Sequence, residues 1–86
     1  MNNNFKLVVV RNIGFESESI FGDRGSIVKV VDGRYIDNEN FTWDNDGNGF
    51  KSPEEFMRYF GEDDHYQTDF KLYNSNARKD NRRDFI

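Results

Sequence analysis

The pair Asp32-Gly33 separates two short apolar segments, residues 26–31 and 34–36, and this arrangement constrains the fold more than any other feature of the chain. An Asp-Gly pair tolerates the positive φ angles that a two-residue hairpin turn requires. The segment before the pair is rich in β-branched residues, which favour strands. We therefore expect an antiparallel hairpin at the centre of the fold.

Other segments extend this sheet. Residues 5–11 are apolar and β-branched, and residues 68–73 alternate with period two, so both are predicted strands. The strand that begins at 34–36 is expected to widen over 37–40 and to continue through 41–43. Residues 13–21 are predicted to form a long polar loop, and residues 50–51 a short strand end.

One helix is expected after the turn at residues 44–49. Ser52 is placed to cap it, Pro53 suits the first helical position, and Glu55 stands where a capping box needs an acid. Phe56 and Phe60 then share one face. The sequence thus predicts a mostly-β, barrel-like fold of about five strands with one short helix near residues 53–60, and a less regular α+β fold is the alternative.

Size and composition indicate one small domain. The chain has 86 residues and no cysteine, so its core must come from nine Phe, four Tyr, one Trp and the aliphatic runs. Residues 1–73 are expected to fold together, and residues 74–86 to form a basic, flexible tail. The predicted core is Phe5, Leu7, Val9, Ile27, Val28, Val30, Tyr35, Trp43, Phe56, Phe60, Phe70 and Leu72.

The segment Gly22-Asp-Arg-Gly-Ser-Ile-Val-Lys-Val-Val-Asp-Gly33 resembles the entry to the central hairpin of Src-homology-3-like small β-barrels. The resemblance extends over about residues 5–73. Proteins with that fold bind peptides or nucleic acids or serve as phage accessory proteins, so the resemblance implies an architecture without fixing a function.

Residues 44–55 also resemble the calcium loop of an EF-hand. Such a loop takes oxygen ligands at fixed spacings around a glycine; here they would be Asp44, Asp46, Asn48, the Phe50 carbonyl, Ser52 and Glu55. Lys51 stands where these loops carry a β-branched apolar residue, and residues 41–43 alternate like a strand where an incoming helix is needed. The same residues serve as a hairpin turn and a helix cap, and we favour that interpretation; calcium binding is the alternative.

Charge is unevenly distributed along the chain. Residues 1–36 carry a net charge of +1, residues 37–69 carry −8 and residues 70–86 carry +3. Folding that gathers the carboxylates of the middle region would create one negative face, and such a face can imitate the phosphates of DNA. The predicted face consists of Asp37, Glu39, Asp44, Asp46, Glu54, Glu55, Glu62, Asp63 and Asp64.

These features favour a non-enzymatic interaction protein that inhibits a basic host nucleic-acid-binding protein, such as a nucleoid protein or part of the transcription machinery. The only histidine, His65, stands among acids, and the serines have no base nearby in sequence, so we expect no catalytic site and no cofactor. The composition resembles that of small acidic early proteins of large bacteriophages. With no apolar run long enough to span a membrane and no secretory signal, a cytoplasmic location is expected, in the host bacterium if the chain is phage-encoded.

The tail supports a third hypothesis. Arg78, Lys79, Arg82 and Arg83 form a basic cluster, and exposed aromatic side chains could stack on bases. Direct nucleic-acid binding through the tail is therefore a second alternative. Whether the chain is a monomer or a homodimer stays open.

Overall fold

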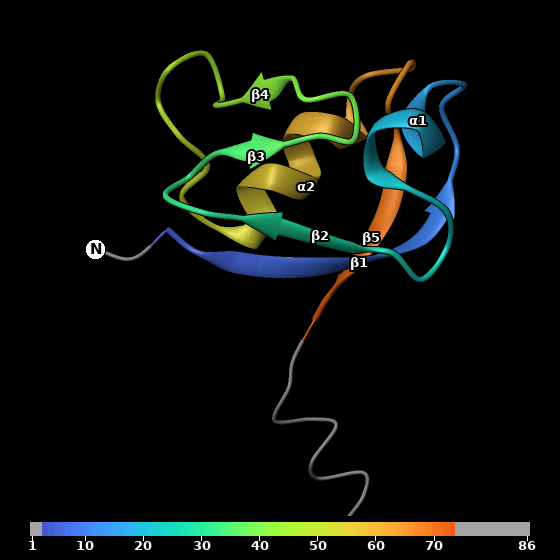
Figure 1. Ribbon diagram of the computed structural model, residues 1–86, viewed down its shortest axis with the longest axis horizontal. Coiled ribbons are helices and arrows are strands. Elements are labelled where there is room, and N and C mark those ends of the chain that lie inside the picture. Colours follow the sequence, from blue (N-terminus) through green and yellow to red (C-terminus); the bar gives the residue numbers. More distant parts are fainter. Residues whose placement is uncertain (1–2, 74–86) are drawn as a thin grey trace, which may run out of the picture.

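The computed structural model describes residues 3–73, which form five strands and two helices around one core (Figure 1). The elements are β1 (Phe5–Asn12), α1 (Ser17–Phe21), β2 (Ile27–Val30), β3 (Tyr35–Ile36), β4 (Thr42–Trp43), α2 (Pro53–Gly61) and β5 (Thr68–Leu72). The mostly-β prediction with a short helix near residues 53–60 is confirmed. The strands form two separate sheets, β2-β1-β5 and β3-β4, and these do not close into a barrel. The predicted basic tail lies outside the described residues.

The larger sheet is antiparallel, with β1 at its centre. Side chains on a strand alternate between the two faces of a sheet, so Leu7 and Val9 point to one face while Lys6 and Val8 point to the other. Leu7 and Val9 are buried, together with Val28 of β2. A register shift between Val9 and Arg11 marks a β-bulge in the pairing of β1 with β5.

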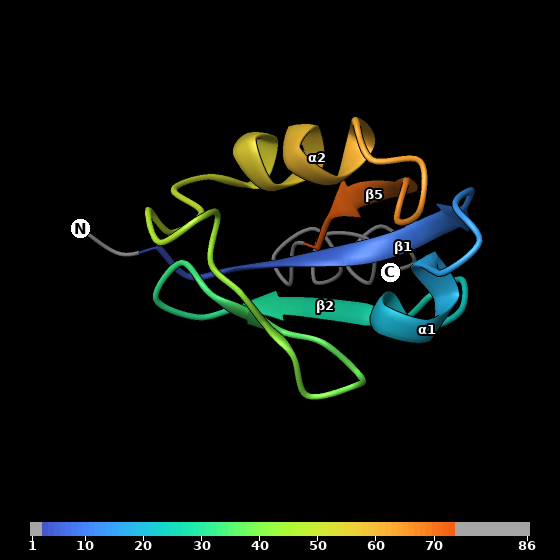
Figure 2. The ribbon, with the colours of Figure 1, turned by 90° about the horizontal axis from the view of Figure 1, so that it is seen from above.

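Both helices lie on the buried face of this sheet. Figure 2 shows α2 on the β5 side and α1 beside one end of β2. The predicted cap of α2 is confirmed, because the Ser52 hydroxyl accepts a hydrogen bond of 3.1 Å from the backbone N–H of Glu55. The Glu55 carboxylate in turn accepts one of 2.6 Å from the N–H of Lys51. Phe56 and Phe60 are fully buried beneath the helix.

Aromatic rings fill the space between helix and sheet. The ring centroid of Phe21 lies 4.9 Å from that of Phe60 and 5.0 Å from that of Phe70, both in edge-on geometry. Phe50 is also fully buried and lies 4.9 Å from Phe56. Edge-on ring pairs at these distances add stability beyond the area that they bury.

Two segments differ from the sequence prediction. The expected loop at 13–21 contains α1, which buries Ile20 and Phe21. The polar residues that precede Ile20 belong to this short helix. At its start the Ser17 hydroxyl donates a hydrogen bond of 2.8 Å to the Gly14 carbonyl oxygen. Phe50 lies in no strand, although its ring is central to the core.

Two predicted core residues are exposed. Ile27 is 49% exposed because it precedes the buried Val28 on a strand and therefore points to the opposite face. Leu72 is 53% exposed because it ends β5, an edge strand with a neighbour on one side only.

The predicted continuous strand over residues 34–43 is wrong. Residues 37–40 reverse the chain, so β3 pairs with β4 in antiparallel register, with Tyr35 opposite Trp43. Asn40 takes a positive φ of 68° in this turn, and the Asp37 N–H donates to the Phe41 carbonyl at 2.9 Å. The reversal brings Trp43 against Tyr59 and Phe60 of α2, with Phe41 beside Trp43, and both form part of the surface described below.

Candidate functional site

Asp37 holds the β3–β4 turn together from within. Its carboxylate accepts hydrogen bonds from the backbone N–H groups of Glu39 at 2.8 Å and Phe41 at 3.0 Å. It also accepts one of 2.8 Å from the indole Nε1–H of Trp43. With 5% of its surface exposed, Asp37 is not part of an acidic face, and its predicted place there is corrected. The backbone N–H groups of the turn point inward, and the Asp37 carboxylate is buried because it accepts hydrogen bonds from them.

Trp43, fixed in this way, is the centre of a row of aromatic side chains that we call the aromatic strip. Its ring centroid lies 5.0 Å from that of Phe41 and 5.2 Å from that of Tyr66. Tyr59 lies farther away, at 6.4 Å. The row continues through His65, 6.1 Å from Tyr66, to a contact of 5.2 Å between His65 and Phe15. The strip consists of Phe15, Phe41, Trp43, Tyr59, His65 and Tyr66.

The strip combines a rigid base with exposed ends. Phe15 is 81% exposed and Phe41 is 58% exposed, values that are high for aromatic residues. Trp43 is half-buried, because its ring also contacts the core residue Phe60 at 5.1 Å. Contiguous exposed apolar surface of this kind marks interaction sites more often than isolated exposed residues do.

Carboxylates lie near the two tyrosines of the strip and contribute to the raised pKa values of both. The pKa of Tyr59 is raised by partial burial and then by the charges of Asp46, Asp63 and Asp44. The pKa of Tyr66 is also raised, first by partial burial and then by Glu16, Asp63 and Glu39. Negative charge near a phenol opposes its ionisation, so five carboxylates lie close enough to act on the strip. They are Glu16, Glu39, Asp44, Asp46 and Asp63, which we call the carboxylate rim.

Four members of the rim were predicted from the sequence, and Glu16 was not. Of the other residues predicted for the acidic face, Glu54 in α2 and Asp64 in the loop before β5 are exposed. Glu55 and Glu62 line a small pocket of about 230 Å³ with Arg58 and Tyr59. One cation, Arg58, therefore lines the same pocket as these two carboxylates.

The loop at residues 44–55 forms a turn and a helix cap. Asn45, Asp46, Gly47 and Gly49 all have positive φ angles, and the Asp44 carbonyl accepts a hydrogen bond of 2.7 Å from the Gly49 N–H. The Asp44 side chain accepts one of 3.1 Å from the Gly47 N–H.

This geometry does not assemble the predicted calcium ligands. Ser52 and Glu55 are engaged in capping α2, and the strand β4 precedes the loop where an EF-hand has a helix. Within residues 3–73, no group of three or more His, Asp or Glu side chains is placed to hold a metal ion. The loop, which contains Asn48 and Phe50, instead connects β4, with Trp43 of the aromatic strip, to α2.

No local signal in the sequence identifies the strip. Three of its members stand directly beside an acid, in Phe15-Glu16, Trp43-Asp44 and Asp64-His65. The core residues Phe50 and Phe56 also have a charged neighbour, although both rings are fully buried. A charged neighbour in the sequence therefore does not separate the rings of the strip from those of the core.

Comparison of the chain with known families, with curated proteins and with solved structures found no match. Within the described part of the chain, neither helix is long and apolar enough to cross a membrane. Function is therefore inferred from the strip and its rim.

Proposed function

We propose that this protein is a non-enzymatic interaction protein that binds a basic nucleic-acid-binding protein through the aromatic strip and the carboxylate rim. The observation that carries the proposal is the coincidence of the two features, because exposed rings and carboxylates occupy the same surface. Arginine and lysine side chains are attracted to both.

Each component has a separate role in such an interface. A cation within about 6 Å of an aromatic ring gains about 0.5–2 kcal/mol, and more as water is excluded. Carboxylates at the margin steer a positive partner toward the rings and accelerate association. Tyrosine and tryptophan are also the residue types that most often dominate binding energy at protein interfaces.

The centre of the strip is pre-organised. The indole N–H of Trp43 is held by Asp37, and its ring contacts Phe60 in the core. A side chain that is already ordered loses little conformational entropy when a partner binds, so more of the contact energy appears as affinity.

The basic partner is expected to be one that normally binds nucleic acid. The rim presents several negative charges at short range, as a phosphate backbone does. A protein surface that accepts phosphates would then accept the rim, and its nucleic acid would be displaced. A phage origin and a bacterial host partner stay predictions from composition.

Competition with DNA tests the proposal. A purified basic bacterial nucleoid protein is mixed with a fluorescent DNA duplex, and this chain is added at increasing concentration. We expect release of the DNA at low salt and weaker competition as salt screens the charges.

A matched pair of variants then locates the surface. Asp44→Asn/Asp46→Asn/Asp63→Asn keeps the side-chain oxygen acceptors of the turn and should weaken competition about tenfold, or about 1.4 kcal/mol. Glu18→Gln/Asp23→Asn/Asp32→Asn removes the same charge elsewhere and should have little effect. Equal competition by both triple variants would overturn the proposal, as would a lack of competition by the unmodified chain.

A further inference from the structure

The larger sheet has a second, uncovered face, which we call the outer sheet face. It consists of Lys6, Val8, Val10, Ile27, Lys29 and Lys71. Figure 1 shows α1, α2 and the β3–β4 hairpin on the other side of β1 and β2. Val10 is 41% exposed and Ile27 is 49% exposed, so the centre of this face is apolar and open.

Lysines lie at one end of that apolar centre. In the antiparallel register Lys6 lies directly opposite Lys29, and Val8 lies between Ile27 and Lys71. Like charges directly opposite each other on neighbouring strands destabilise a sheet. Within residues 3–73 the one ion pair is that of Arg11 with Asp69, at 2.8 Å, so the structure describes no carboxylate paired with these lysines.

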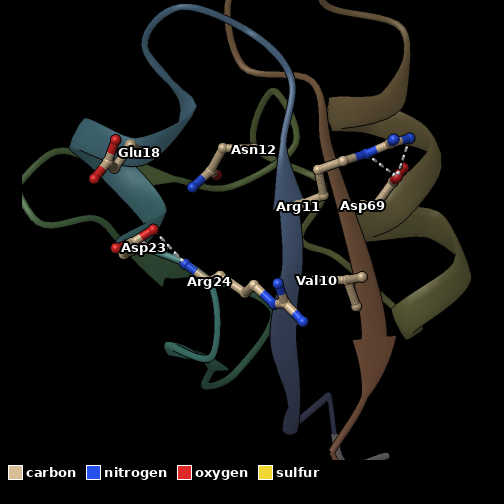
Figure 3. A pocket seen from close by; sticks show the side chains of 7 residues that line it. All are labelled: Val10, Arg11, Asn12, Glu18, Asp23, Arg24 and Asp69. Atoms are coloured by element: carbon tan, nitrogen blue, oxygen red, sulfur yellow. Dashed lines mark hydrogen bonds and ion pairs between the residues drawn. The ribbon is translucent and has the colours of Figure 1, made fainter.

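A pocket of about 570 Å³ extends this face toward α1 (Figure 3). In Figure 3 the Arg24 side chain lies across β1 near Val10. Carboxylates are also present: Glu18 and Asp23 line the pocket, and Asp69 is paired with Arg11. The unbalanced charge is therefore concentrated at the end of the face that carries the three lysines.

The chain leaves the sheet beside these lysines. The Tyr73 N–H donates to the Lys6 carbonyl at 3.0 Å, and the Lys6 ammonium lies 5.7 Å from the centre of the Tyr73 ring. The basic residues Arg78, Lys79, Arg82 and Arg83 follow in the sequence and lie outside the described residues.

We propose that the outer sheet face binds single-stranded nucleic acid. The lysines contact phosphates, and unstacked bases lie on Val8, Val10 and Ile27. A single strand is favoured over a duplex because its bases are free to contact an apolar surface, whereas a duplex presents mainly phosphates along its outside. The inference is independent of the proposed function, since it uses none of the residues of the strip or the rim.

Fluorescence anisotropy with a labelled oligothymidylate and a labelled oligouridylate, each about 16 nucleotides long, tests the inference on the full chain. We expect saturable binding at low salt to one or both. Lys29→Gln/Lys71→Gln should weaken binding at least tenfold and reduce the slope of log affinity against log salt by about 1.4, since each lost phosphate contact contributes about 0.7.

Lys51→Gln/Arg58→Gln is the matched control. It removes the same charge from the side of the molecule that carries α2, and it should leave both affinity and slope nearly unchanged. Thermal unfolding of both variants establishes that they are folded.

Four outcomes would overturn the inference. One is an absence of binding by the unmodified chain at low salt. Another is equal weakening by the two double variants, which would indicate a general charge effect. The third is loss of binding only when Arg78, Lys79, Arg82 and Arg83 are all changed to Gln, which would assign the site to the tail. A salt-insensitive dimer abolished by Ile27→Asp would assign the face to a second copy instead.

Discussion

The aromatic strip and the outer sheet face both expose apolar atoms, yet they differ in chemistry and in origin. The strip presents rings with carboxylates near its two tyrosines, and the outer sheet face presents β-branched aliphatic side chains with lysines at one end. The net charge of −4 describes neither. The comparison teaches that local charge, rather than the total, sets the electrostatic character of each face.

The two surfaces also arise from different ranges of the sequence. The outer sheet face follows from strand periodicity, because alternate residues of neighbouring strands must share a face. The strip joins Phe15, the β3–β4 hairpin, α2 and the loop before β5, and only the tertiary fold brings them together. It therefore depends on structural residues such as Asp37, and the outer sheet face does not.

The largest expected effect is on stability, and it tests whether the aromatic strip depends on Asp37. Asp37→Ala leaves two backbone N–H groups and the Trp43 indole N–H without their acceptor, and we expect a loss of about 3 kcal/mol in the free energy of unfolding. Urea unfolding followed by Trp43 fluorescence measures it.

The neighbouring acid supplies the control for that measurement. Glu39 is exposed, so Glu39→Ala should change the free energy of unfolding by less than about 0.5 kcal/mol. If the two variants are equally stable, the assignment of Asp37 to the interior of the turn is wrong.

A smaller effect is expected on the pKa values of the two tyrosines, and it tests the negative charge near the aromatic strip. Asp63 acts on both tyrosines of the strip, after partial burial as the main cause of each raised pKa. Asp63→Asn keeps the acceptor for the His65 N–H and removes the charge. We expect the pKa values of Tyr59 and Tyr66 to fall toward the usual value of 10.0, as followed by phenolate absorbance.

The raised pKa values of Tyr59 and Tyr66 also predict how the free energy of unfolding changes with pH. A tyrosine whose pKa is higher in the folded state contributes stability that is complete below pH 10.0 and is lost as pH rises through the folded value. The free energy of unfolding should thus decline above about pH 10, and less steeply in Asp63→Asn. A steeper decline in the variant would contradict the placement of Asp63 beside the strip.

Local rules account for the parts of the fold that the sequence predicted. The Asp32-Gly33 turn, the strands β1, β2 and β5, and the Ser52 cap each depend on a few adjacent residues with strong conformational preferences. The predicted hairpin across that turn is limited to one bridge between Val31 and Arg34, because β2 and β3 belong to different sheets. Four rim carboxylates were also predicted, because an acidic segment that folds compactly must place several acids near one another.

The remaining features depend on contacts between distant segments. Phe21 stands in a predicted loop and Phe50 in a predicted strand end, and the burial of both rings is decided by the tertiary packing. The reversal at residues 37–40 requires a carboxylate that turns inward to meet three donors, an arrangement that no periodicity reveals. Ile27 and Val28 are both predicted core residues, but adjacent residues of a strand face opposite sides of the sheet, so only Val28 lies in the core.

Titration of Trp43 fluorescence with an oligoarginine peptide tests the central claim most directly, because the only tryptophan of the chain lies at the centre of the strip. We predict a saturable change in emission at low salt that is lost in Asp44→Asn/Asp46→Asn/Asp63→Asn and retained in Glu18→Gln/Asp23→Asn/Asp32→Asn. An unchanged emission, or the same response from both triple variants, would contradict the assignment of the strip as a binding surface for cations.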